Sequence, residues 1–145
     1  MNHHHLDNLV KVGQLQSAPF DEIEAMRMLN IAHNRLRDSE ITEVSIAGRF
    51  RSAYNAAHIS ALIALRWHGY RCKNELMAFH CLGDTLGWPT NRWQTFDAAL
   101  EKRNLVEYEG YAEIEESTMD SLHSLTASLI KDVDALMKSP SATMK

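Results

Sequence analysis

The segment of residues 43–69 restricts the fold more than any other part of the chain. It contains the run "SIAGRFRSAYNAAHISALIALRWHGY", and through "NAAHISALIAL" it carries apolar or small residues on nearly every face of a helix. A helix that is hydrophobic all round is buried within a bundle or against a partner subunit. Gly69 supplies a stop signal at its end. The segment therefore predicts a long central helix that other elements surround.

Apolar residues recur at helical spacing in four further segments, which predicts helices over about 21–38, 74–86, 91–108 and 112–137. Asp21 is a suitable N-cap for the first, with Glu24 at the capping-box position. Thr90 or Asn91 can cap the helix that follows Pro89, and Gly110 is expected to end it. No segment has a strand pattern that competes with these helices. A length of 145 residues is typical of a single domain. The pattern of helices predicts an all-α fold, a four-helix bundle with an additional short helix.

The two ends of the chain are expected to lie outside this bundle. Residues 1–20 are interpreted as an N-terminal lead-in, in which "LDNLVKVGQL" can form a short helical turn. The histidine run at 3–5 is either a purification remnant or a natural start, and it is a poor basis for a metal site. Residues 21–138 are assigned to the bundle and residues 139–145 to a disordered tail.

The charged residues are distributed unevenly. The net charge of −4 argues against a general nucleic-acid-binding protein held by phosphate contacts. Between Val44 and Asn74 the charged side chains are all basic, and between Asn104 and Ile130 they are all acidic: Arg49, Arg51, Arg66, Arg71 and Lys73, then Glu107, Glu109, Glu113, Glu115, Glu116 and Asp120. One interpretation, favoured for most of these residues, is that the two segments neutralise each other across a bundle or subunit contact. The other is that the basic segment leaves a local basic surface that holds a phosphate.

Several functional classes find no support in the sequence. No apolar run approaches the roughly 20 residues that span a bilayer, and no signal-peptide core follows the N-terminus. Cys72 and Cys81 lack the spacing of a metal pair and are predicted to be reduced, buried thiols. The histidines are scattered, so neither a metal site nor another cofactor is predicted. The chain is expected to be cytoplasmic, without a membrane partner.

The central helix carries the first set of candidate site residues, Arg49, Tyr54, Asn55 and His58. Arg51 and Asn55 are one turn apart, as are Tyr54 and His58, so the members of each pair share a helix face. Polar side chains in such a helix need partners when they are buried. Either Tyr54 and His58 satisfy each other or a nearby carbonyl, which is the favoured interpretation, or they line a cleft.

The stretch "KRNLVEYEG" carries the second set, Arg103, Asn104 and Tyr108. Asn104 and Tyr108 are spaced as neighbours on a helix surface, and so are Arg103 and Glu107. Spacing alone favours an ordinary Arg–Glu pair at the surface beside an Asn–Tyr contact.

The ordered set "RFRSAYNAAHISALIALRWHGYR", "FHCLGDTLG" and "FDAALEKRNLVEYEG" resembles one bacterial branch of the HEPN superfamily, over about residues 45–110. That branch has an "RF..AYNAA" helix, a "GYR" stop, a helix ending in "TLG" and a closing "KRN...Y" motif. The resemblance implies a four-helix bundle that commonly forms homodimers. It also implies that active members carry a metal-free ribonuclease site at the dimer cleft, made by an Arg and a His that follows four to six residues later.

In this match, Arg103 corresponds to the motif arginine and Asn104 to the polar residue that commonly follows it. Tyr108 stands where the shortest form of the motif has its histidine. Arginine suits the crowded phosphorane, and histidine suits proton transfer at neutral pH. Tyrosine, with a pKa of about 10, is a poor base there but can stack on a nucleobase. His58 or His80 is an alternative source of an imidazole.

Two hypotheses follow. The first is a HEPN-like, RNA- or nucleotide-associated protein of a bacterial toxin–antitoxin or phage-defence system, a metal-independent endoribonuclease if active. The second is a non-catalytic dimeric module, in which Arg103 and Asn104 hold a helix interface and the acidic stretch 107–120 binds a basic partner. The expected partners are a second copy of the chain, RNA or a nucleotide, and an antitoxin or other protein.

Overall fold

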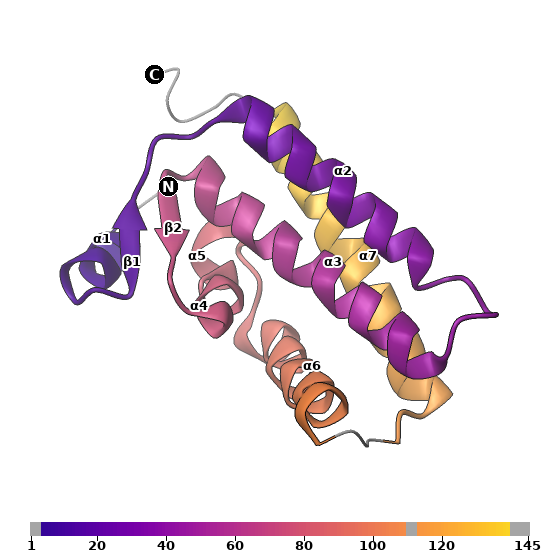
Figure 1. The fold of residues 1–145 in the computed structure, drawn as a ribbon. Helices are drawn as coiled ribbons and strands as arrows, with labels where there is room; N and C mark the ends of the chain where they lie inside the picture. Colours follow the sequence, from indigo (N-terminus) through magenta and orange to yellow (C-terminus); the bar gives the residue numbers. More distant parts are fainter. Residues whose placement is uncertain (1–3, 110–112, 140–145) are drawn as a thin grey trace.

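A computed structural model of the chain describes residues 4–109 and 113–139. Their helices and strands follow one another in the order α1 (His4–Lys11), β1 (Leu15–Ser17), α2 (Glu22–Asp38), α3 (Ile46–Trp67), β2 (Tyr70–Cys72), α4 (Glu75–His80), α5 (Leu82–Leu86), α6 (Thr90–Tyr108) and α7 (Glu116–Lys138). Figure 1 shows α2, α3 and α7 as long neighbouring rods, with α6 on the far side of α3 and the short elements gathered near the N-terminus. The predicted all-α bundle is thereby confirmed.

Helix α3 is the centre of the fold. It begins at the N-cap Ser45, whose hydroxyl accepts a hydrogen bond from the Gly48 amide at 3.1 Å, and α2, α4, α6 and α7 all pack against it. Small side chains along one broad side of α3 let its neighbours approach closely: Ala53, Ala56, Ala57, Ala61 and Ala64 are fully buried. The predicted central position of this helix is confirmed, although Arg51 and Asn55 near its start are exposed.

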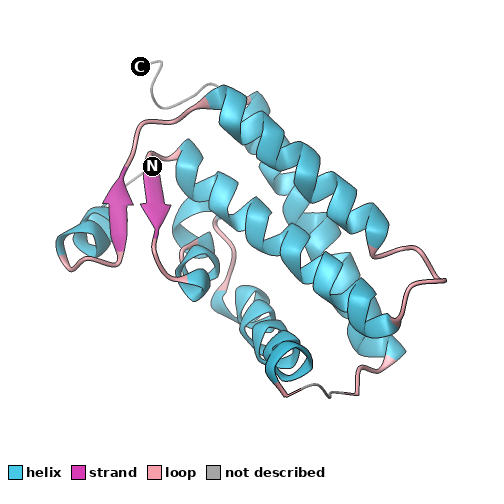
Figure 2. Cartoon of the chain, in the orientation of Figure 1, coloured by secondary structure: helices cyan, strands magenta, loops and turns pink. Residues whose placement is uncertain are grey.

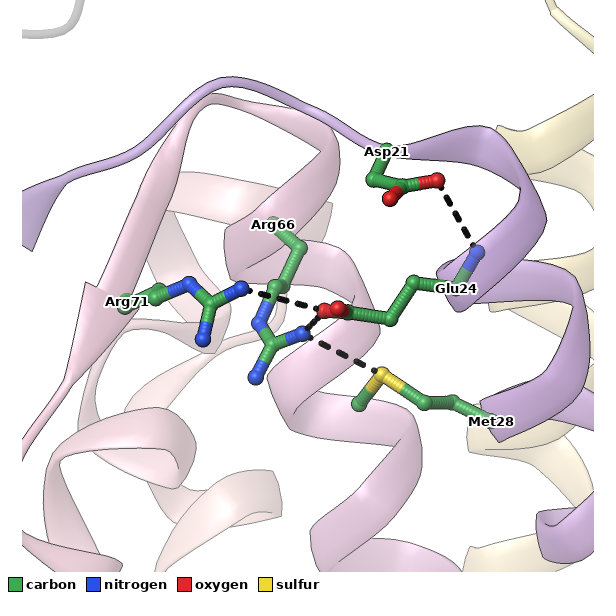
Figure 3. A network of polar contacts seen from close by, with 5 residues as sticks. All are labelled: Asp21, Glu24, Met28, Arg66 and Arg71. Atoms are coloured by element: carbon green, nitrogen blue, oxygen red, sulfur yellow. Dashed lines mark hydrogen bonds and ion pairs between the residues drawn. The ribbon is translucent and has the colours of Figure 1, made fainter.

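The start of α2 is fixed to the end of α3 by a charged network (Figure 3). Asp21 caps α2 as predicted, since its Oδ1 accepts from the Glu24 amide at 3.1 Å. The Glu24 carboxylate pairs with Arg66 of α3 and lies 3.3 Å from Nη2 of Arg71 on β2. The same Arg66 side chain donates to the Met28 sulfur at 3.5 Å. Glu24 of α2, and not the acidic segment, therefore neutralises Arg66 and Arg71 of the basic segment.

The expectation that no strand competes with the helices was wrong at one place. β1 and β2 form a two-stranded antiparallel sheet, with Leu15 opposite Cys72 and Ser17 opposite Tyr70 (Figure 2). Each strand has three residues, which is too short for a recognisable alternation. Gly69 ends α3 with a φ of 96°, a conformation that glycine adopts readily, and this turn directs the chain into β2.

The predicted helix over 74–86 is two helices, α4 and α5. Their junction is Cys81, whose φ of −91° and ψ of 1° are not helical. Gly87 ends α5 in the left-handed conformation. Pro89, rather than Thr90 or Asn91, is the N-cap of α6. The last helix begins at Glu116, later than expected, while the predicted stop at Gly110 and residues 140–145 of the predicted tail lie outside the described residues.

The described part of the N-terminal lead-in, residues 4–20, contributes directly to the hydrophobic core. Leu6 of α1 is fully buried and Leu15 of β1 is 1% exposed. The Tyr70 hydroxyl donates to Asp7 at 2.5 Å, and His5 lies 2.7 Å from Asp84, so α1 is attached to both β2 and α5. Residues 4–20 therefore pack as part of the bundle in this structure.

This packing yields a test with the substitution Leu6→Ala. Removing a buried leucine side chain leaves a cavity and is expected to lower the free energy of unfolding by about 2–5 kcal/mol. Val12 is 69% exposed, so the control Val12→Ala is expected to change it by less than about 0.5 kcal/mol. Urea denaturation followed by circular dichroism measures both. Equal, small effects of the two substitutions would show that residues 4–20 do not belong to the core.

Candidate polar cluster between α3, α4 and α6

Arg103 lies on the face of α6 that turns toward α3 and α4. Its Nη2 donates to both carboxylate oxygens of Glu75, at 2.9 and 3.1 Å, and its guanidinium carbon is 5.2 Å from the centre of the Tyr54 ring. The side chain is 21% exposed. Within the part of the chain that the structure describes, its Nε is buried without a hydrogen-bond partner. Arg103 is therefore a mostly buried cation packed between α6, α4 and α3.

The predicted local pair between Arg103 and Glu107 does not form. Glu107 instead pairs with Arg51 of α3 at 3.0 Å. Glu75 reaches Arg103 because it is the first residue of α4, where the Asn74 side chain caps the helix by accepting from the Leu76 amide at 2.9 Å. A charge-assisted contact to both carboxylate oxygens at a half-buried position is stronger than an exposed pair one turn apart. The tertiary contact thus replaces the local one.

Tyr54 and His58 lie beside this ion pair. Their rings stack at a centroid distance of 6.3 Å and an interplanar angle of 5°, and both contact Phe79. Tyr54 is 3% exposed. Among the described residues, its hydroxyl and Nε2 of His58 are buried and form no hydrogen bond of good geometry, although the Glu75 carboxylate lies close enough to the Tyr54 hydroxyl to act on it by hydrogen bonding. The two side chains therefore do not satisfy each other through these atoms, which leaves unpaired polar atoms next to Arg103.

Burial sets the protonation of both groups. It raises the pKa of Tyr54 well above its ordinary value of 10.0; the Glu75 carboxylate raises it further and the Arg103 guanidinium opposes this. Burial also lowers the pKa of His58 below its ordinary 6.5; Glu75 opposes that shift and Arg103 adds to it. At neutral pH the cluster thus contains a protonated phenol, a neutral imidazole and a guanidinium.

A histidine–carboxylate pair lies near the same cluster. Nε2 of His80 is 2.9 Å from Oδ2 of Asp97, and the His80 ring is 4.7 Å from that of Trp93. The charge of Asp97 is close enough to contribute to the raised pKa of Tyr54. Sequence reasoning considered His80 but missed Asp97 and Glu75. Neither acid lies at a recognisable spacing from its partner, so no local signal identified them.

Asn104 and Tyr108 lie on a different face of α6 from Arg103. They line a surface hollow with Ala98, Lys102 and Leu105, and Tyr108 is 79% exposed. Successive residues of a helix are rotated by about 100°, so the residue after an inward-facing arginine turns outward. Asn104 and Tyr108 share a face, as their spacing predicted, but within one chain that hollow does not include Arg103.

The remaining candidates are dispersed. Arg49 donates through Nε to the Ser39 carbonyl at 2.9 Å and lies 4.0 Å from Glu116. Asn55 is exposed and lines a separate hollow with Arg51, with which it shares a face as predicted. Of the four residues named on α3, only Tyr54 and His58 join Arg103.

The described residues contain no group of three or more side chains suited to hold a metal ion. In the same residues, no helix has the length and apolar character needed to cross a bilayer. No family model, curated protein or solved structure matches the chain.

The pKa of His58 gives a test of the cluster. Because this pKa is lower in the folded protein than in the unfolded chain, the unfolded chain binds the extra proton below about pH 6.5. Stability from the neutral imidazole is complete above that pH and is lost as the pH falls toward the lowered value. A tenfold difference in proton affinity corresponds to about 1.4 kcal/mol.

Urea denaturation between about pH 7.5 and pH 5 is expected to show this loss in wild type and a shallower one in His58→Gln. Other titrating groups are common to both proteins, so the difference reports His58 beside Glu75 and Arg103. Parallel pH profiles for the two proteins would contradict the burial of a neutral His58.

Proposed function

We propose that the chain is a HEPN-like protein that binds the phosphodiester of RNA at the polar cluster formed by Arg103, Tyr54 and His58. The observation that carries the proposal is the meeting of three buried polar groups: Nε2 of His58 and Nε of Arg103 lack partners among the described residues, and the Tyr54 hydroxyl beside them has no polar neighbour that acts on it by hydrogen bonding except Glu75. Each buried polar atom without a partner costs about 1–3 kcal/mol. A phosphate would supply acceptors to the phenol and the guanidinium, and Arg103 provides the charge.

The proposed chemistry is metal-free cleavage. The neutral imidazole of His58 accepts the proton of the 2′-hydroxyl as its oxygen attacks phosphorus, and the bond to the 5′-oxygen breaks. Arg103 stabilises the phosphorane. The products are a 2′,3′-cyclic phosphate and a 5′-hydroxyl, whose proton returns from the imidazolium. Glu75 occupies Nη2 of Arg103 in this structure, so an incoming phosphate has to displace it.

This proposal differs from the sequence hypothesis in its choice of residues. Asn104 and Tyr108 receive no role in the chemistry, because they line a hollow on another face of α6. His58 takes the place that Tyr108 could not fill as a base. The wider expectations stay part of the proposal: a cytoplasmic protein of a toxin–antitoxin or phage-defence system that forms homodimers.

The second candidate is a non-catalytic interaction module, and the Arg103–Glu75 pair favours it. This contact of 2.9 Å connects α4 to α6 and satisfies part of the guanidinium without any ligand. Under this alternative, the cluster serves only to hold α6 on the bundle.

Cleavage of a labelled single-stranded RNA in EDTA separates the two candidates. The ribonuclease proposal expects Arg103→Gln to lower the rate by at least about 100-fold. Glu75→Gln is expected to raise it, because the carboxylate no longer competes with phosphate. Arg27 is exposed on α2, so Arg27→Gln serves as the control and should retain the wild-type rate.

Unfolding measurements on the same variants complete the test. If the pair is only structural, Arg103→Gln destabilises the protein by leaving Glu75 unpaired, and the double variant Arg103→Gln with Glu75→Gln recovers much of that loss. Absence of cleavage by wild type and by folded Glu75→Gln would reject the ribonuclease.

A further inference from the structure

Helix α6 has a second face, which the bundle leaves uncovered. The helix buries Phe96 and Ala99 against its neighbours. On the opposite side Ala98 is exposed, and Leu105 and Tyr108 are 45% and 79% exposed. These three positions follow one another at intervals of seven and three residues, so they form a stripe along one side of the helix.

Two adjoining hollows follow this stripe. One, with a volume of about 290 Å³, lies between α6 and the start of α7 and has Phe50, Ala99 and Leu122 in its floor. The other, of about 640 Å³, continues along α6 to Glu109. They share Ala98 and Lys102 in their linings. We call them together the α6 groove. Its apolar lining and exposed stripe are those of a surface that receives an amphipathic helix.

The charges around the α6 groove define what can occupy it. Glu101 and Glu109 line it, and both are exposed. Further exposed carboxylates, which do not line the groove, lie on the described segment that leads into α7 and on its first turns, at Glu113, Glu115, Glu116 and Asp120. Of these, Glu116 lies 4.0 Å from Arg49 and Asp120 lines a separate hollow. Lys102 is the cation in the lining. Since carboxylates dominate, the groove repels an acidic segment and attracts a basic one.

We propose that the α6 groove binds a basic amphipathic helix of a partner protein. Apolar side chains of that helix, at intervals of three and four residues, pack on Leu105 and Tyr108, while its Lys or Arg residues face Glu101 and Glu109. Helix α6 has 19 residues and is therefore about 28 Å long, which gives room for about five turns of a partner. The proposal is independent of cleavage at Arg103, because the groove does not use the polar cluster.

The test uses a fluorescein-labelled model peptide of the length of α6, with leucine on one face and lysine on the other. A matched peptide with glutamate in place of every lysine is the control. Fluorescence anisotropy is expected to give a micromolar Kd for the basic peptide, weakened by salt, and at least about tenfold weaker binding of the acidic peptide.

Matched variants locate the contact. Leu105→Ser and Glu109→Lys are each expected to weaken binding by about tenfold or more. Ile23→Ser removes an aliphatic side chain that is 68% exposed on α2, and Glu43→Lys reverses an exposed charge before α3; both should leave the affinity nearly unchanged. Circular dichroism confirms that all four variants are folded.

Several results would overturn the proposal. These are a Kd of the basic peptide weaker than about 1 mM, equal binding of both peptides, or equal effects of Leu105→Ser and Ile23→Ser. A concentration-dependent dimer in sedimentation that Leu105→Ser abolishes would assign the groove to a second copy of the chain. Binding of a labelled RNA that Tyr108→Ser abolishes and Arg103→Gln does not would assign it to RNA.

Discussion

The burial of most of α3 is the constraint on which the rest of the structure depends. A face of alanines lets neighbouring helices approach closely, while Arg51 and Asn55 stay exposed near its start. A polar residue on the buried part of α3 must find its partners within the helix or on the element that packs over it, because water cannot reach it. The placement of polar residues on this helix therefore determines where the bundle has polar contacts in its interior.

The polar residues of α3 meet this requirement in different ways. Ser60 is fully buried, and its hydroxyl donates to the Ala56 carbonyl of the same helix at 2.8 Å. The Ala53 carbonyl in turn accepts from Thr126 of α7 at 3.5 Å. Tyr54 and His58 are larger and present the Tyr54 hydroxyl and His58 Nε2 without such partners. Buried atoms without a partner also occur elsewhere in the described residues, at Thr85 Oγ1 and Arg66 Nε, but only the cluster brings a phenol, an imidazole and a guanidinium together. That combination is the reason to regard the cluster as a site.

Local features were predictable in part, since Pro89 replaced the predicted caps of α6 and Cys81 divided the predicted helix over 74–86. Contacts between helices were not predictable. The cap at Asp21 follows from residues that are neighbours in the chain, and the burial of most of α3 follows from its own composition. The partner of Arg103 is Glu75, which lies 28 positions away, and spacing favoured Glu107 instead. The spacing predicted that Asn104 and Tyr108 share one face of α6. Whether that face points toward α3 or toward solvent depends on how α6 packs, which spacing does not reveal. The strand Leu15–Ser17 was not predicted for the same reason, because its partner β2 is distant in the chain.

Helix α6 places the polar cluster and the α6 groove on opposite sides of one rigid element. Arg103 points into the bundle toward Glu75, while Leu105 and Tyr108 point outward. Suppose that a partner in the α6 groove bound equally well whatever the placement of α6 relative to its neighbours. It would then leave the Arg103–Glu75 ion pair unaffected, however tightly it bound. A partner that also contacts α7 would favour one spacing of α6 and α7, and it would bias the Arg103–Glu75 contact only if α6 also moved relative to α4. In that case, by reciprocity, a phosphate that displaces Glu75 would change the affinity of the groove by the same factor. Communication between the two faces thus depends on whether a partner contacts Leu122 and Ser121 of α7 in addition to α6, because contacts to α6 alone carry no preference for one spacing.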